Sequence, residues 1–399
     1  MKKFFIVLAA VVVAAILFGV IYVATGIDFP PLKGQYKVGK TALDIVDKSR
    51  REIFSNNPAD KREILLTIYY PANPKADAKP SPYVSGALAD VMSKKTGIPR
   101  FLLDTFHAQT YDEAPVAQIK SPFPVLLFSQ VVQGQLPPYS SLLEEVASHG
   151  YIIVCISHQY SDTFVVYPDG RAVYVTPEGM FHNRDYSEYA AHEEEALQVL
   201  KVWSDDTIFA LNQLKEINKS HKILANSLDL TNIGIFGHSF GGSTVADVMQ
   251  RDSRIKAGVN LDGHIRGDVM SKGVRQPYFI MTSQRLGPYW FAMSGNVQKV
   301  LETSKLCYLM GIRNTGHNSF VTDVPFIIKK YGFILRQDVG TIDPNENYAL
   351  ITDYTVQFFD QEIKGIHSKL LDQINPSNTD AVIKKQKYPE VTIQKYAEK

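Results

Sequence analysis

From Pro124 onward, short apolar segments alternate with longer amphipathic segments. The apolar segments predict strands at 125–128, 151–156, 232–236, 256–261, 276–282 and 306–311. The amphipathic segments predict helices at about 139–148, 187–217, 240–250, 296–304 and 346–363. Strands that alternate with helices form a mostly parallel sheet with helices packed against its faces. This pattern therefore predicts an α/β protein with a central, mostly parallel sheet.

The segments outside this alternation set the expected domain boundaries. An apolar strand is expected at 64–70, residues 72–120 show no steady periodicity and could be a lid insertion, and Asp169-Gly170 has the composition of a hairpin turn. We expect four parts, namely an N-terminal membrane anchor or signal segment, a linker, a catalytic domain and a loosely held tail. They cover 1–26, 27–59, 60–365 and 366–399.

The N-terminus carries Lys2 and Lys3, followed by an uncharged apolar run over 4–24. This run has about 20 residues, which is enough to cross a bilayer and is longer than the apolar region of a secretory signal. We therefore expect a transmembrane helix before the sheet domain, with the lysines in the cytoplasm and the domain outside it. Small residues at Ala24 and Gly26 leave secretion after signal cleavage as the alternative.

Composition is that of a globular protein, with 45% hydrophobic residues and a formal net charge of +1. The absence of a basic excess argues against a nucleic-acid partner. The only two cysteines, Cys155 and Cys307, lie in apolar runs. They are expected to be buried free thiols, with a disulfide as the alternative.

A Gly-x-Ser-x-Gly motif lies between a predicted strand and a predicted helix: Gly237-His238-Ser239-Phe240-Gly241. On such a turn, the serine hydroxyl is exposed at the edge of the sheet as a nucleophile, and the glycines allow close backbone contacts. A helix N-cap serine is the simpler alternative.

A serine nucleophile needs a histidine base and a carboxylate that orients the histidine. In the fold that places the serine on such a strand-to-helix turn, the chain order is Ser, acid, His. His317 lies in a glycine-containing loop after the strand 306–311. Asp262 directly follows the strand 256–261 and lies between Ser239 and His317. Ser239, Asp262 and His317 are therefore the predicted catalytic residues.

Other candidate site residues have weaker signals. The run His192-Glu193-Glu194-Glu195 lacks the HExxH spacing and is interpreted as a solvated helix face, so no metal or other cofactor is expected. His149 and His158 flank a predicted strand, where local hydrogen bonds explain them. Tyr289, Trp290 and Phe291 are tentative pocket residues, with a core role equally plausible.

Several runs resemble the plasma-type (group VII) platelet-activating factor acetylhydrolases and their bacterial relatives. The similar runs include residues 237–245, 139–141, 147–151 and 260–262, together with Gly316-His317 and Phe320. The resemblance covers about residues 60–365. It implies an α/β-hydrolase fold and supports the roles of Ser239, Asp262 and His317.

One loop departs from that family. Where the family carries a His-Gly-x-Gly run, this chain has Gln130-Val131-Val132-Gln133. A backbone N–H of this loop and that of the residue after the nucleophile form the family's oxyanion hole. By position, the resemblance implies Val132 and Phe240 as the donors.

The resemblance implies a calcium-independent, phospholipase A2-like acetylhydrolase that cleaves short or oxidised sn-2 acyl esters through an acyl-enzyme. The expected partners are thus an ester or phospholipid substrate and, through the N-terminal helix, a membrane. A general carboxylesterase, lipase or polyesterase is the first alternative, because fold and triad fix the reaction better than the substrate. A non-catalytic binding module on the same fold is the second.

Overall fold

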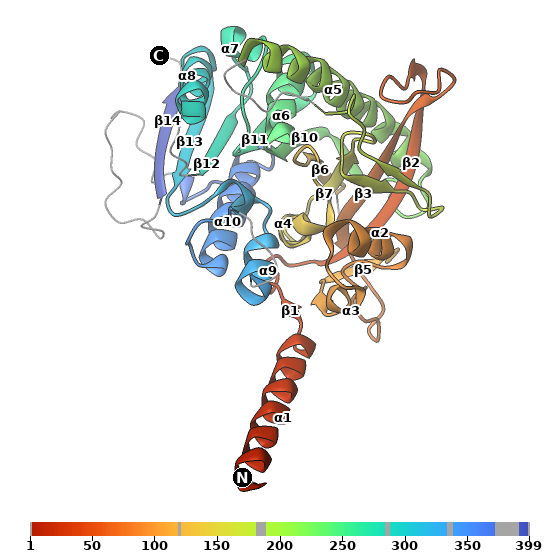
Figure 1. Cartoon of the computed structure of the whole chain (residues 1–399). Helices are drawn as coiled ribbons and strands as arrows, with labels where there is room; N and C mark the ends of the chain where they lie inside the picture. The colour runs from red at the N-terminus through yellow and green to blue at the C-terminus, as the bar shows by residue number, and fades with distance from the viewer. Residues whose placement is uncertain are drawn as a thin grey trace.

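The computed structural model describes residues 2–118, 121–180, 189–283, 288–332, 338–371 and 391–397. Within these ranges, ten strands form one mixed sheet (Figure 1). In sheet order they are β14 (Val391–Ala397), β13 (Leu306–Ile312), β12 (Tyr278–Ser283), β11 (Ile255–Leu261), β10 (Leu228–His238), β6 (Phe123–Ser129), β7 (Ile152–Ser157), β3 (Lys61–Ala72), β2 (Lys37–Arg51) and β5 (Thr110–Asp112). The six strands from β13 to β7 are parallel, so their carboxyl ends meet at one edge. This confirms the predicted mostly parallel central sheet.

Helices cover both faces of the sheet. They are α4 (Ser140–Ser148) and α10 (Pro344–Glu362) on one face, and α5 (Tyr189–Ser220), α6 (Phe240–Arg251) and α8 (Pro288–Thr303) on the other. Side chains alternate between the faces along each strand. On β6, Leu126 and Phe128 therefore pack with α4 and α10, whereas Val125 and Leu127 pack with α5 and α6. Burial on both faces explains why the central strands are almost continuously apolar.

Two expectations for the chain ends were wrong. The expected linker 27–59 contains β2, which pairs with β3 and β5, and the expected loose tail contains β14, which pairs antiparallel with β13. Both strands lie toward the edges of the sheet in Figure 1. Lys, Arg and Asp residues interrupt the apolar pattern of β2, because many of its side chains face solvent.

The insertion 72–120 forms a small unit of α2 (Gly86–Thr96), α3 (Arg100–Leu103), β4 (Phe106–His107) and β5. Its own apolar cluster includes Met92 and Leu103, and it packs against α9 (Val324–Tyr331) through Phe106 and Tyr331, whose rings are 6.2 Å apart. The insertion is therefore an ordered layer beside the sheet, while its role as a lid stays a prediction.

Residues Lys2–Ala24 form the helix α1, which stands clear of the rest of the protein in Figure 1. The hydroxyl of Tyr22 donates to the carbonyl oxygen of Lys330 in α9, at 3.0 Å. Across the described ranges, no helix has both the length and the apolar character that crossing a membrane requires. The structure therefore does not support the predicted transmembrane helix.

Both cysteines are free and buried, as expected. Cys155 lies on β7 and Cys307 on β13. Burial raises the pKa of the Cys155 thiol well above its usual value and that of Cys307 to about 12. Both side chains therefore behave as small apolar groups in the core.

Candidate active site

Ser239 lies on the sharp turn between β10, which ends at His238, and α6, which begins at Phe240. Its φ of 57° and ψ of −117° lie in a region that L-residues rarely adopt. A Cβ on Gly241 would lie 2.0 Å from the carbonyl oxygen of Ser129, so only glycine fits there. The Ser239 side chain makes no capping hydrogen bond, which argues against the N-cap interpretation.

His317 brings Ser239 and Asp262 into one hydrogen-bonded line. Its Nε2 lies 2.8 Å from Ser239 Oγ, and its Nδ1 lies 2.7 Å from Asp262 Oδ2. The Asp262 carboxylate accepts a hydrogen bond from Nδ1–H, which leaves Nε2 as the acceptor for the serine hydroxyl. The three residues predicted from chain order therefore lie in contact at the carboxyl edge of the sheet.

Asp262 is buried and firmly held. It follows β11 with a φ of 53°, and its backbone N–H donates to the carbonyl oxygen of Met281. Ser283, at the end of β12, donates from its backbone N–H to Oδ1 at 2.8 Å and from its hydroxyl to Oδ2 at 2.9 Å. The sequence analysis did not predict Ser283, because its contact with Asp262 arises from the neighbouring positions of β11 and β12 in the sheet.

His238 packs against His317 and was also missed. It is buried, and the two rings are 4.5 Å apart. Burial raises the pKa of Tyr139 far above its usual value, so the tyrosine stays protonated. The Tyr139 hydroxyl can thus donate to His238 Nδ1 at 2.7 Å. Through His238, this hydrogen-bonded pair contacts the proposed base His317.

The loop after β6 holds the proposed oxyanion donor Val132. The neighbouring N–H groups are engaged, that of Val131 with the Tyr139 hydroxyl at 3.4 Å and that of Gln133 with the Ser161 carbonyl at 2.9 Å. The N–H of Val132 donates to no acceptor among the residues that the structure describes. Val132 also packs in the same apolar cluster as Phe240. The two proposed donors therefore belong to neighbouring segments.

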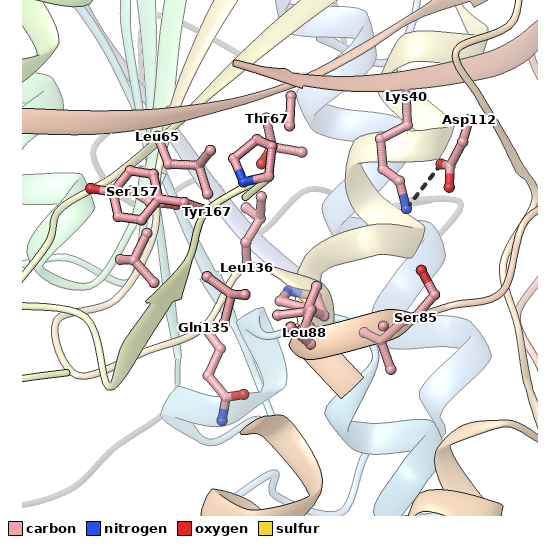
Figure 2. Close-up of a pocket in the computed structure, with 18 of the residues that line it drawn as sticks. Lys40, Leu65, Thr67, Ser85, Leu88, Asp112, Gln135, Leu136, Ser157 and Tyr167 are labelled. Atoms are coloured by element: carbon pink, nitrogen blue, oxygen red, sulfur yellow. Dashed lines mark ion pairs between the residues drawn. The ribbon is translucent and has the colours of Figure 1, made fainter. Parts of the chain in front are cut away.

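A cavity of about 580 Å³ lies beside this loop (Figure 2). Its walls combine apolar side chains with a few polar ones, including Leu65, Leu88, Leu136, Gln135 and the ion pair of Lys40 with Asp112 at 3.4 Å. The start of α2 forms one wall, so the insertion does border a cavity. None of Ser239, Asp262 and His317 lines it, whereas Gln130 of the loop does.

The remaining sequence candidates have mixed outcomes. Tyr289, Trp290 and Phe291 belong to helix α8, which begins at Pro288 and thus earlier than the helix expected at about 296–304. Their side chains lie outside the described residues. Glu193 was expected on a solvated helix face. Its side chain instead forms an ion pair with Arg266.

This chain is similar to known proteins in both sequence and fold. The model of the family "platelet-activating factor acetylhydrolase, isoform II" matches residues 21–380. A probable 1-alkyl-2-acetylglycerophosphocholine esterase of Arthroderma benhamiae is 27% identical over 396 residues, covering 91% of this chain and 92% of that protein. A platelet-activating factor acetylhydrolase of Gallus gallus is 23% identical over 374 residues, covering 85% and 84%.

Among solved structures, a ferulic acid esterase from Streptomyces cinnamoneus is similar with a TM-score of 0.73 and 25% identity. The match covers 91% of this chain and 98% of that one. The fold is therefore that of the α/β-hydrolases, as the sequence predicted.

Proposed function

We propose that this chain cleaves short or oxidised sn-2 acyl esters of glycerophospholipids. The chain belongs to the family "platelet-activating factor acetylhydrolase, isoform II". The enzyme is a serine ester hydrolase. The observation that carries the proposal is the hydrogen-bonded line from Ser239 through His317 to Asp262. The names of the relatives support the choice of substrate.

The proposed reaction has two steps. Ser239 Oγ attacks the ester carbonyl carbon while His317 Nε2 takes the hydroxyl proton, and the backbone N–H groups of Val132 and Phe240 hold the oxyanion. The intermediate collapses to an acyl-enzyme, and the leaving alcohol takes the proton from His317. Water then attacks the acyl carbon with His317 as base, which releases the carboxylic acid and restores Ser239. Asp262 stabilises the imidazolium in both steps.

An ester panel tests the proposal on the full-length protein. It compares 1-alkyl-2-acetylglycerophosphocholine, a phosphatidylcholine with two long chains, a triglyceride and p-nitrophenyl acetate, each with the wild type and with Ser239→Ala. We expect the acetyl phospholipid to be preferred over the long-chain one and all activity to be lost in the variant. Full activity in Ser239→Ala would remove this serine from the mechanism.

A general carboxylesterase is the second candidate, favoured by the similarity to a solved ferulic acid esterase. Aryl esters or triglycerides cleaved far faster than the acetyl phospholipid would favour it. A binding module without activity would show no acyl-enzyme burst and no covalent labelling by an organophosphonate.

We also propose that the N-terminal segment holds the domain at a membrane, outside the cytoplasm. The uncharged run that follows Lys2 and Lys3 supports this, as do exposed apolar side chains on α1 such as Phe4 and Phe5, 68% and 62% exposed. The alternative remains secretion after cleavage. Cell fractionation with N-terminal sequencing of the mature protein separates the two, and intact protein in the cytoplasmic fraction would contradict both.

A further inference from the structure

A buried polar network lies beneath the loop that carries Val132. His158, directly after β7, places its Nδ1 2.9 Å from Asp206 Oδ2 and its Nε2 3.2 Å from the hydroxyl of Ser129. Arg62 pairs with Asp206 at 2.6 Å and with Glu52 at 2.8 Å. All five side chains are at most 2% exposed. The network therefore joins β3, α5 and the ends of β7 and β6.

Ser129, His158 and Asp206 repeat the order of groups in a catalytic triad, but they do not form a second active site. All three side chains are fully buried. Trp203 stacks on the His158 ring at 3.9 Å and 14°. A substrate carbonyl has no access to this serine, so the arrangement must be structural.

The protonation states of His158 and Asp206 determine which groups in the network donate hydrogen bonds and which accept them. Burial lowers the pKa of His158, so its ring is neutral near pH 7. Burial also works against the charge on Asp206, but Arg62 and His158 outweigh it and hold the pKa of Asp206 below its usual value. Nδ1–H thus donates to the Asp206 carboxylate, and Nε2 accepts from the Ser129 hydroxyl.

The His158 ring is linked to the two segments that carry the proposed oxyanion donors. On one side, Ser129 is the last residue before the loop of Val132. On the other side, Trp203 contacts the ring of Phe240 edge to face, with the centroids 5.0 Å apart. One buried imidazole is therefore in contact with the start of the first donor segment and, through one indole, with the second.

The chain that follows His158 holds the same loop through its backbone. Asp162 accepts from the backbone N–H of His158 at 2.8 Å. The Ser161 carbonyl accepts from Gln133, and the backbone N–H of Thr163 donates to the carbonyl of Gly134 at 3.1 Å. Displacement of His158 would therefore loosen the loop at both of its ends.

We propose that His158, held by Asp206 and Arg62, is a positioning residue that fixes the Val132 and Phe240 N–H groups relative to each other. The inference rests on the proposed function, in which these two groups hold the oxyanion. A preorganised donor acts mainly on the transition state, so a loosened network should lower kcat and leave KM almost unchanged.

The test uses Ser129→Ala, which removes only the hydroxyl that contacts His158. Tyr70→Phe is the matched control, because it also removes one buried hydroxyl, one that donates to the Ala114 carbonyl at 2.7 Å outside the network. For Ser129→Ala, we expect kcat on p-nitrophenyl acetate to fall about tenfold with KM within about twofold, less than the hundredfold or more typical of a lost donor. The inhibition constant of an alkyl trifluoromethyl ketone, which forms a tetrahedral adduct with the serine, should rise by the same factor.

Two further variants act on the same contacts. Trp203→Phe keeps an aromatic ring on His158 but alters the contact with Phe240, and His158→Gln removes the ring itself. We expect both to lower kcat and ketone affinity together. If His158→Gln does not fold, Ser129→Ala and Trp203→Phe decide the question.

Equal kcat and ketone affinity in Ser129→Ala and Tyr70→Phe would overturn this inference, as would a change confined to KM. Ser239→Ala separates that failure from failure of the proposed function. If Ser239→Ala is inactive, only the role of His158 has failed. If it keeps full activity, the proposed function fails, and this inference fails with it.

Discussion

At the residue scale, the Asp262 carboxylate sets which nitrogen of His317 carries the proton. In Asp262→Asn, the amide could donate to Nδ1 instead of accepting from it, which would leave Nε2 protonated and unable to accept from Ser239. We expect kcat for p-nitrophenyl acetate to fall by roughly 10³ to 10⁴. Asp268→Asn, at an aspartate whose side chain is 69% exposed, is the control and should keep wild-type kcat. Similar kcat values for the two variants would contradict the role of Asp262.

Gln133 adopts a left-handed backbone conformation with a φ of 55°. Such a conformation costs a residue with a Cβ about 1 to 2 kcal/mol, whereas glycine adopts it freely but loses about 0.5 to 1 kcal/mol more entropy on folding. Gln133→Gly should therefore raise the free energy of unfolding by roughly 0.5 to 1 kcal/mol. Denaturant unfolding measures this, with Gln133→Ala as the control that removes the side chain and keeps the strain. Destabilisation by Gln133→Gly would show that the strain is not costly.

The sequence predicted the residues whose signal is local. Ser239 has a motif, and Asp262 and His317 follow from chain order and from their places after strands. His238 and Ser283 touch these residues only because separate strands end at the same edge of the sheet. Contacts of that kind depend on register, which no local pattern in the sequence encodes.

At the scale of elements, β14 covers the edge of β13. Deletion of 391–399 should expose the unpaired backbone groups of β13, lower the melting temperature by several degrees and cause self-association. Thermal unfolding and size-exclusion chromatography over a range of concentrations measure both effects. A shorter deletion of 398–399 leaves the strand in place and should change neither. A monomer with an unchanged melting temperature after the longer deletion would contradict the structural importance of β14.

Strands at or next to the two ends of the sheet explain what the sequence could not predict of the fold. Central strands such as β6 and β7 are buried on both faces, so their apolar runs stand out. On β2, buried and exposed positions alternate irregularly and charged residues are frequent. The tail is rich in Lys and Gln, so no apolar pattern marked β14. Edge strands need fewer apolar residues, and the strand signal weakens accordingly.

At the scale of the whole molecule, three buried carboxyl groups make stability depend on pH. Burial raises the pKa of Glu144 and Asp162 to about 8 and that of Asp323 to about 7. Between their unfolded pKa values near 4 and these folded values, the folded protein holds protons that the unfolded chain has released. The free energy of unfolding should therefore fall as pH rises from about 5 to 8, by up to about 1.4 kcal/mol per pH unit for each group.

Urea unfolding at pH 5.5 and pH 8 measures this dependence. Glu144→Gln removes one titrating group and should flatten the decline, whereas Glu302→Gln, at an exposed glutamate, should leave it unchanged. Stability that stays constant or rises over this range would show that these carboxyl groups are ionised in the folded protein.

The two buried cysteines also have a practical consequence. Thiol reagents attack the thiolate, and burial suppresses that form in both Cys155 and Cys307. Since the chain contains no other cysteine, one cysteine introduced on the surface would be the single thiol accessible to a maleimide. A dye or spin label could thus be attached at a chosen site while both native cysteines remain in place. Two introduced surface cysteines, one in the insertion and one elsewhere, would carry a pair of labels that reports the distance between these two parts of the molecule.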